Sequence, residues 1–169
     1  MTTQPATAAR TDAPALRLND YLPYRLSVAS NAVSELVARA YQSRFGLTIP
    51  QWRIIAVLAE DGAATQQTIC SRTVMDKVTI SRAARALTER GLISRAPHHR
   101  DGRSHRLGLS PDGRALYAEI APLALAYEAR LLGSFSATDV ALAQALLRRL
   151  EAAAAALSGA ANEPDAARI

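Results

Sequence analysis

DKVTISRAARALTERGLISRAPHHRDGRSHR, residues 76–106, decides the fold of this chain, because it joins the signals of a helix to those of a hairpin. Asp76 is a suitable N-cap for a helix that runs to Arg90 and stops at Gly91. The apolar residues of this helix fall on one side at helical spacing, namely Ile80, Ala83, Ala84 and Leu87. We therefore expect its charged side to point away from the core.

The second half of the stretch is typical of a β-hairpin. Residues 92–95 and 106–109 have the composition of two short strands, and the second alternates as a half-buried strand does. Residues 96–105 between them form a polar tip, in which Asp101-Gly102 supplies a turn signal. The sequence thus predicts a two-stranded hairpin directly after the helix.

Positive charge is concentrated in this same stretch. Residues 76–106 hold eight basic and three acidic residues, so their net charge equals the +5 of the whole chain. The remaining basic and acidic residues cancel each other. A local cationic patch on a neutral body indicates a protein that binds a polyanion such as nucleic acid.

Helical patterns occupy the chain on both sides of residues 76–106. Capping residues and apolar spacing predict five further helices, over residues 23–45, 48–61 and 65–72, and beginning at residues 110 and 136. A short helix, a turn, a second helix and a hairpin in this order form a winged helix-turn-helix. The predicted fold class is mainly α with a small β-hairpin wing, that is, a winged helix-turn-helix with flanking dimerisation helices.

The domain organisation follows from these elements. We expect an N-terminal tail over residues 1–17, dimerisation helices over 18–47 and 110–157, a DNA-binding domain over 48–109, and a frayed tail over 158–169. The tail lacks the pattern of a secretory signal, and no apolar run reaches the roughly 20 residues that span a bilayer. We therefore expect a cytoplasmic protein without a membrane partner.

The amino-terminal half of the second helix of such a motif enters the major groove of duplex DNA. Side chains that donate hydrogen bonds to bases or phosphates are placed there, namely Lys77, Thr79, Ser81, Arg82 and Arg85. Arg100 and Arg106 of the hairpin are expected to contact phosphates, which position the protein without specifying a sequence.

Four short motifs in this order and spacing resemble the MarR family of bacterial transcriptional regulators. They are Asp76-Lys-Val-Thr-Ile-Ser-Arg82, Leu87-Thr-Glu-Arg-Gly-Leu-Ile93, Asp101-Gly-Arg103 and Leu109-Ser-Pro-Asp-Gly113. The resemblance implies that Arg103 of the wing enters the minor groove and that Asp101 holds its guanidinium by a salt bridge. A narrow minor groove attracts arginine, which agrees with this role. It also implies a homodimer on a pseudo-palindromic operator, and repression rather than activation.

The flanking helices carry more apolar surface than a small winged module can bury, so a second copy of the chain is the expected partner. The resemblance further implies a small-molecule effector, an aromatic acid or its coenzyme A thioester, in a cleft between the dimer helices and the winged module. Aromatic walls and a cationic partner for such an anion are offered by Tyr21, Tyr24, Arg25, Ser27, Asn31, Trp52 and Arg53. Trp52 lies on the same apolar side of its predicted helix as Ile55, so burial in the core is an equally good interpretation of Trp52.

Two other chemistries are open to the sequence. Cys70 is the single cysteine, which excludes an intrachain disulfide and a cysteine-based zinc site. We expect it to be a small buried residue, with oxidant sensing through its thiol as the alternative to ligand sensing. The wing histidines 98, 99 and 105 suit phosphate or water contacts better than a metal site. Sequence motifs of nucleotide-binding or hydrolytic enzymes are missing, so we predict neither catalysis nor a cofactor.

Overall fold

A computed structural model describes residues 15–98 and 101–160 of the chain, and the side chains of residues 15–96 and 105–158. The described elements are, in chain order, η1 Leu18–Asp20, α1 Leu22–Ala38, α2 Gln42–Phe45, α3 Ile49–Asp61, β1 Ala64–Thr65, α4 Gln66–Thr73, α5 Lys77–Glu89, β2 Ile93–His98, β3 Asp101–Leu109, α6 Pro111–Leu132 and α7 Ala137–Ala160.

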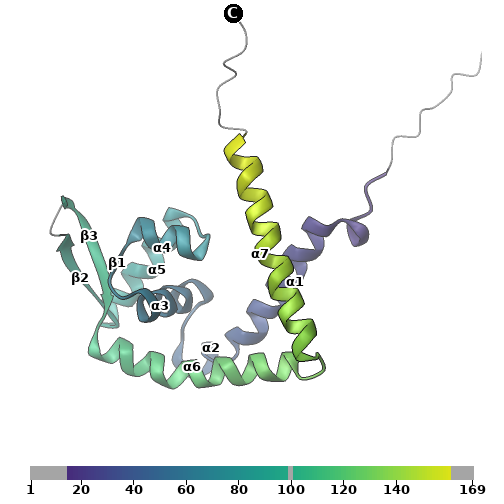
Figure 1. The fold of residues 1–169 in the computed structure, drawn as a ribbon. Helices are drawn as coiled ribbons and strands as arrows, with labels where there is room; N and C mark the ends of the chain where they lie inside the picture. Colours follow the sequence, from purple (N-terminus) through teal and green to yellow (C-terminus); the bar gives the residue numbers. More distant parts are fainter. Residues whose placement is uncertain (1–14, 99–100, 161–169) are drawn as a thin grey trace, which may run out of the picture.

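The elements form a compact lobe and an arm (Figure 1). Helices α3, α4 and α5 and the small sheet make up the lobe, and α6 leads from the sheet along the lobe towards the arm. Helix α7 rises from the end of α6, and α1 belongs to the same side of the molecule. This arrangement confirms the expected mainly helical fold with a small wing. None of the described helices is long and apolar enough to cross a membrane.

The helix starts are capped where the sequence predicts. Thr48 and Gln51 form a reciprocal capping box, in which the Thr48 amide donates to Gln51 Oε1 at 2.8 Å and the Gln51 amide donates to Thr48 Oγ1 at 3.4 Å. The side chains of Thr65, Asp76 and Ser110 likewise accept a backbone hydrogen bond at the start of α4, α5 and α6. Local chemistry therefore fixes where these helices begin.

The first predicted helix, residues 23–45, is wrong in one respect, because the structure breaks it into α1 and α2. The break places Tyr41 in the core at 2% exposure, and its ring stacks on that of Trp52 with 5.4 Å between centroids. Burying a tyrosine ring outweighs the loss of about one turn of helix. Gly46, with a φ of +61°, ends α2 as predicted.

The sheet has three antiparallel strands in the order β1-β3-β2, where the sequence predicts two. The added strand β1 is only two residues long, and its partners on β3 are Leu107 for Ala64 and Arg106 for Thr65. Strands β2 and β3 also extend into residues 96–98 and 101–105, which the sequence assigns to the hairpin tip. Backbone pairing continues through these residues as far as His98 opposite Asp101.

A single hydrophobic core joins α3, α4, α5, the sheet and α6. Its fully buried side chains include Ile54, Ile55, Ile69, Ile80, Leu87, Leu107 and Ile120. The apolar side of α5 is therefore turned inward, as the spacing of its residues predicts. Helix α7 differs from all of these, because none of its residues with a described side chain, 137–158, is buried.

The start of α6 packs against the backbone of the chain before β2. Gly113 lies in the first turn of α6 and is buried, and a Cβ added there would lie 2.0 Å from the Leu92 carbonyl oxygen. The Ser110 amide donates to the same oxygen at 3.1 Å. Only glycine allows this approach, so Gly113 sets how closely α6 joins the lobe.

Replacing Gly113 with alanine is expected to destabilise the protein by about 3 kcal/mol, because a rigid carbonyl group must move away from the new methyl group. Thermal unfolding followed by circular dichroism should show a melting temperature lowered by roughly 6–12 °C.

Gly133→Ala is the matched control. Gly133 has a φ of −62°, and its added Cβ would meet backbone oxygens of α6 only at 3.4 Å and beyond. This variant should melt within a few degrees of the unaltered protein, because alanine suits a helical φ. Equal melting temperatures for the two variants would contradict the close approach at Gly113.

Candidate nucleic-acid interface

Helix α5 is fixed at its start by a two-point cap. Asp76 Oδ1 accepts the Thr79 amide at 2.8 Å, and Asp76 Oδ2 accepts the Thr79 hydroxyl at 2.6 Å. The side-chain and backbone hydrogen bonds of Thr79 lower the pKa of the Asp76 carboxyl below its ordinary value. The carboxylate therefore holds the first turn of α5 rigidly, and the Thr79 hydroxyl proton is already engaged there.

The outer side of α5 carries the remaining polar residues predicted for this helix. The side chains of Lys77, Ser81, Arg82 and Arg85 are all exposed. Arg82 and Arg85 lie opposite the buried Ile80 and Leu87. Arg85 Nε donates to Glu89 Oε1 at 2.8 Å, one turn further along the helix. Arg82 makes no ion pair with another described residue. The exposed α5 face thus presents one arginine that is tied to a carboxylate and one that is not.

Two contacts fix α5 and its neighbour α4 against the rest of the lobe. Arg90, just beyond α5, donates through Nη2 to the Phe45 carbonyl at 2.8 Å and through Nη1 to the Gly46 carbonyl at 3.2 Å. Arg72 of α4 donates through Nε to Asp61 at 2.7 Å and lies 3.2 Å from Glu60. The Asp61 hydrogen bond raises the pKa of Arg72. These two arginines therefore orient helices, a role that their position in the sequence does not reveal.

The structure describes only some of the wing residues that the sequence predicts to contact DNA. Arg100 lies outside the described residues, and the backbones of Asp101 and Arg103 belong to β3 without described side chains. The Asp101–Arg103 salt bridge therefore stays a prediction. Arg106 is exposed, and its guanidinium donates to the Ala63 carbonyl, with Nε at 3.1 Å. That bond ties β3 to the chain before β1. The sequence predicts only a phosphate contact for Arg106 and does not predict this structural role.

The structure also locates Cys70 and two of the three wing histidines. His105 is exposed, His98 belongs to β2, and His99 lies outside the described residues. The described side chains contain no group of three His, Cys, Asp or Glu residues that could hold a metal ion. Cys70 is half-buried against the core, whereas we expect full burial, and it lines a hollow of about 310 Å³ with Gln66, Gln67 and Lys77. Cys70 therefore contacts both this hollow and the core.

The predicted effector residues are not gathered into one site. Tyr21 and Tyr24 lie at the start of α1 with exposed rings, and the side chains of Arg25, Ser27 and Asn31 are exposed along the same helix. Trp52 is half-buried on α3, between the rings of Tyr41 and Tyr117, at 5.4 and 5.8 Å between centroids. For Trp52 the structure thus favours the core interpretation.

Arg53 links α3 to α1. Its Nη2 donates to Ser34 Oγ at 3.3 Å. Ser34 shares a face of α1 with Ser27 and Asn31, because residues spaced by three or four lie on the same side of a helix. Burial raises the pKa of the Tyr41 hydroxyl, and the nearby positive charge of Arg53 offsets part of that rise. Arg53 therefore lies at the junction between the lobe and the arm.

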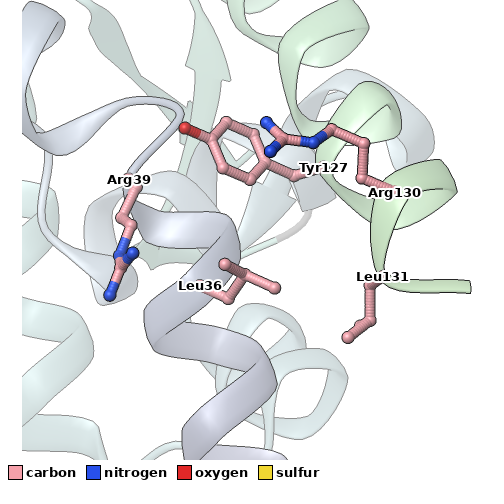
Figure 2. A pocket seen from close by; sticks show the side chains of 5 residues that line it. All are labelled: Leu36, Arg39, Tyr127, Arg130 and Leu131. Carbon is pink, nitrogen blue, oxygen red and sulfur yellow. The ribbon is translucent and has the colours of Figure 1, made fainter.

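A pocket that the sequence analysis missed lies between α1 and α6 (Figure 2). It is lined by Leu36, Arg39, Tyr127, Arg130 and Leu131 and has a volume of about 320 Å³. The two sides of this pocket are almost ninety residues apart in the sequence. No local pattern brings such residues together, because only the crossing of the two helices does so.

Comparison with known proteins supports the geometry. The model of the MarR family matches residues 45–104, which run from the end of α2 into β3. A probable transcriptional regulator from Pseudomonas aeruginosa is 33% identical, with a TM-score of 0.69 over 79% of this chain and 99% of that one. A MarR/EmrR family regulator from Acinetobacter sp. ADP1 is 25% identical, with a TM-score of 0.75 over 82% of this chain and 98% of that one.

A third solved structure shares the fold at lower identity. It is BpsR of Bordetella bronchiseptica, whose DNA binding is regulated by 6-hydroxynicotinic acid. The two chains are 23% identical, with a TM-score of 0.70 over 77% of this chain and 98% of BpsR. These relatives agree with the sequence motifs of α5 and the wing and with the three-stranded sheet. The chain therefore belongs to the MarR family of transcriptional regulators, with the winged helix fold of that family.

Proposed function

We propose that this protein is a homodimeric, ligand-responsive repressor that binds a pseudo-palindromic DNA operator. The observation that carries the proposal is the exposed α5 face, on which Arg82 and Arg85 stand opposite the buried side of the helix and Ser81 is exposed beside them. MarR-family regulators are DNA-binding regulators rather than enzymes, and they bind DNA as dimers.

The dimensions and chemistry of α5 suit the major groove. Thirteen residues make a helix of about 20 Å, which fits into the groove of B-DNA. Arg82 is the residue best placed for a bidentate bond to guanine, since Arg85 is held by Glu89. Val78, 58% exposed on the same helix, is suited to contact with a thymine methyl group.

The apolar surface of the arm supports a dimer. Helices α1, α6 and α7 expose large apolar side chains, among them Leu22, Val28, Val33, Leu125, Leu142, Leu146, Leu147 and Leu150. Monomers rarely leave so much apolar surface open. A groove of about 410 Å³ between α1 and α6, lined mainly by Val33, Val37, Leu125 and Leu132, offers a place for side chains of a second copy. Two copies would present two α5 helices to successive major grooves.

The arm also suggests how an effector could release DNA. Helix α6 joins the sheet at Gly113 and the arm at its far end, so its angle sets the distance between the two α5 helices of a dimer. A ligand that binds one angle more tightly than the other shifts the population of dimers that fit the operator. An aromatic acid or its coenzyme A thioester is the proposed effector class, and the response of BpsR to 6-hydroxynicotinic acid supports the former.

Oxidation of Cys70 is the alternative to ligand binding as the signal that releases DNA. Its thiol is half-buried rather than enclosed, and Lys77 of α5 lines the same hollow. An added oxygen or disulfide partner there would press on the start of α5.

Arg82→Ala is expected to weaken binding to the preferred duplex tenfold to a hundredfold, which corresponds to about 1–3 kcal/mol for a bidentate base contact. The variant should also accept a wider range of sequences at one base pair. Enrichment of a random duplex pool by each protein, followed by titration of the enriched duplexes, measures both effects. A uniform loss on all sequences would assign Arg82 to a phosphate instead.

Arg103→Ala is expected to lower affinity by about tenfold or more, because a preoriented guanidinium leaves the minor groove. The variant should remain a dimer by light scattering and keep its melting temperature. Arg44→Ala is the charge-matched control, since Arg44 lies outside α5 and the wing, where it forms an exposed ion pair with Glu119 at 3.8 Å and lies 5.0 Å from the centroid of the Phe45 ring. Equal affinities for the two variants would refute the minor-groove role of Arg103.

Leu146→Glu is expected to convert the dimer into a monomer, because it places a charge in the apolar face of α7. DNA affinity should fall at the same time, since the two half-sites are no longer bound by one particle. Light scattering and duplex titration report the two effects. Val74→Glu is the control for the light-scattering result alone, because Val74 is 92% exposed in the turn before α5 and outside the arm. A dimeric Leu146→Glu protein would rule out α7 as the interface.

A further inference from the structure

Arg85 and Glu89 form an ion pair on the exposed α5 face. Arg85 Nε donates to Glu89 Oε1 at 2.8 Å across one turn of the helix. The two side chains are 82% and 62% exposed, so water reaches the pair from most sides. An ion pair this exposed contributes little to stability and opens readily when a stronger partner arrives. The pair therefore restrains the Arg85 guanidinium without locking it in place.

The stability of α5 does not account for this ion pair. Glu89 is the last residue of the helix, where the partial negative charge of the helix dipole disfavours a carboxylate. The order of the two residues is also the weaker one, because a carboxylate that precedes its cation stabilises a helix better than the reverse. The acidic side chain at this position therefore has another role.

The ion pair lies on the side of α5 that faces DNA in the proposed complex. Residues three and four positions apart share a side of a helix, so Glu89 continues the row of Arg82 and Arg85. This row lies opposite the buried Ile80 and Leu87. Arg82 forms no ion pair with another described residue. Of the two arginines in the row, Glu89 thus restrains only the second.

A DNA phosphate competes with Glu89 for Arg85. Duplex DNA carries one negative charge per roughly 1.7 Å of its axis, and phosphate oxygens accept hydrogen bonds from a guanidinium group as carboxylates do. A phosphate that binds Arg85 has to displace the carboxylate or lie beside it, and the two anions repel each other. Glu89 therefore weakens the phosphate contact that Arg85 offers to a duplex of any sequence.

We propose that Glu89 is a specificity-determining residue that limits binding to DNA of unrelated sequence, and the proposal rests on the DNA-binding function proposed above. Base contacts fix the register of α5 on an operator, so Arg85 meets whichever phosphate that register provides. On unrelated DNA no register is fixed, and the helix settles where its cations meet phosphates. An unrestrained Arg85 therefore adds more affinity for unrelated DNA than for the operator.

The test measures binding of the full-length protein to two duplexes of equal length over a range of salt concentrations. One duplex is enriched from a random pool, and the other has the same bases in shuffled order. Glu89→Gln, which keeps the shape of the side chain, should bind the shuffled duplex about threefold to tenfold more tightly at low salt, and the enriched duplex by a smaller factor. The slope of log affinity against log salt on the shuffled duplex should steepen by about 0.9 for each Arg85 that gains a phosphate.

Two further measurements separate this role from a structural one. The melting temperature of Glu89→Gln should not fall, because the carboxylate does not stabilise the end of α5. Glu119→Gln is the matched control, since it removes the same charge from an exposed ion pair, with Arg44 at 3.8 Å, outside α5 and the wing. This control should leave both affinities and the salt slope unchanged.

A second substitution shows whether Glu89 acts through Arg85. In a protein that already carries Arg85→Gln, the change Glu89→Gln should no longer steepen the salt slope, because no guanidinium is left to release. Most of the gain in affinity should be lost as well. A gain that persists undiminished would mean that the carboxylate acts on DNA directly, which would overturn the restraint of Arg85.

Two other results would also overturn the proposal. One is a salt slope on the shuffled duplex that Glu89→Gln leaves unchanged, and the other is a gain in affinity that is equal for both duplexes. In either case the salt-sensitive binding of the unaltered protein to the enriched duplex still supports the proposed function. An unaltered protein that binds neither duplex would instead refute the DNA-binding function and this inference together.

Discussion

Burial of one side of α5 is the constraint on which the rest of the structure depends. Ile80 and Leu87 are completely buried, and Ala83 and Ala84 lie beside them in the core. A helix with 3.6 residues per turn that buries this side must present Arg82 and Arg85 to solvent. The position of the cationic surface is therefore a consequence of core packing. The Asp76 cap, the Arg90 bonds to the end of α2 and the Arg72 ion pairs then fix the orientation of that surface.

The lobe satisfies its own packing, whereas the arm does not. Helix α6 contributes Ile120 to the core through its first half, and Leu125 of its second half is exposed. The α7 leucines remain exposed along the whole helix. An isolated helix gains little stability from its own hydrogen bonds, so an amphipathic helix needs a surface to pack on. In the proposed dimer, the folding of the arm and the assembly of two copies are one process.

Sequence analysis is most successful where the controlling interaction is local. The caps at Thr48, Asp76 and Ser110, the stop at Gly46 and the inward side of α5 all follow from residues within about four positions of each other. Features that depend on tertiary contacts escape it. Strand β1 exists because β3 pairs with it, the break before α2 exists because Tyr41 packs on Trp52, and Arg106 binds a carbonyl 43 residues away.

The same distinction applies to the candidate sites. The α5 surface lies on one helix, and its spacing alone predicts it, whereas Asp101 and Arg103 rest on the family resemblance. The predicted effector residues share suitable chemistry along α1 and α3, but chemistry without placement does not define a pocket. The structure instead joins Arg39 to Tyr127 and Arg130, residues that share no segment of sequence.

Any signal from the arm to α5 must cross a narrow connection. The lobe and arm are linked by α6, whose position is set by the Gly113 approach, and by the stack of Tyr41, Trp52 and Tyr117. Both links are tightly packed, and packed interfaces move between discrete arrangements rather than bending continuously. Arg39 lies two residues before Tyr41, and Tyr127 lies on α6, so the pocket between them is next to both links. The orientation of the arm and the position of α5 are therefore coupled through these two packed links.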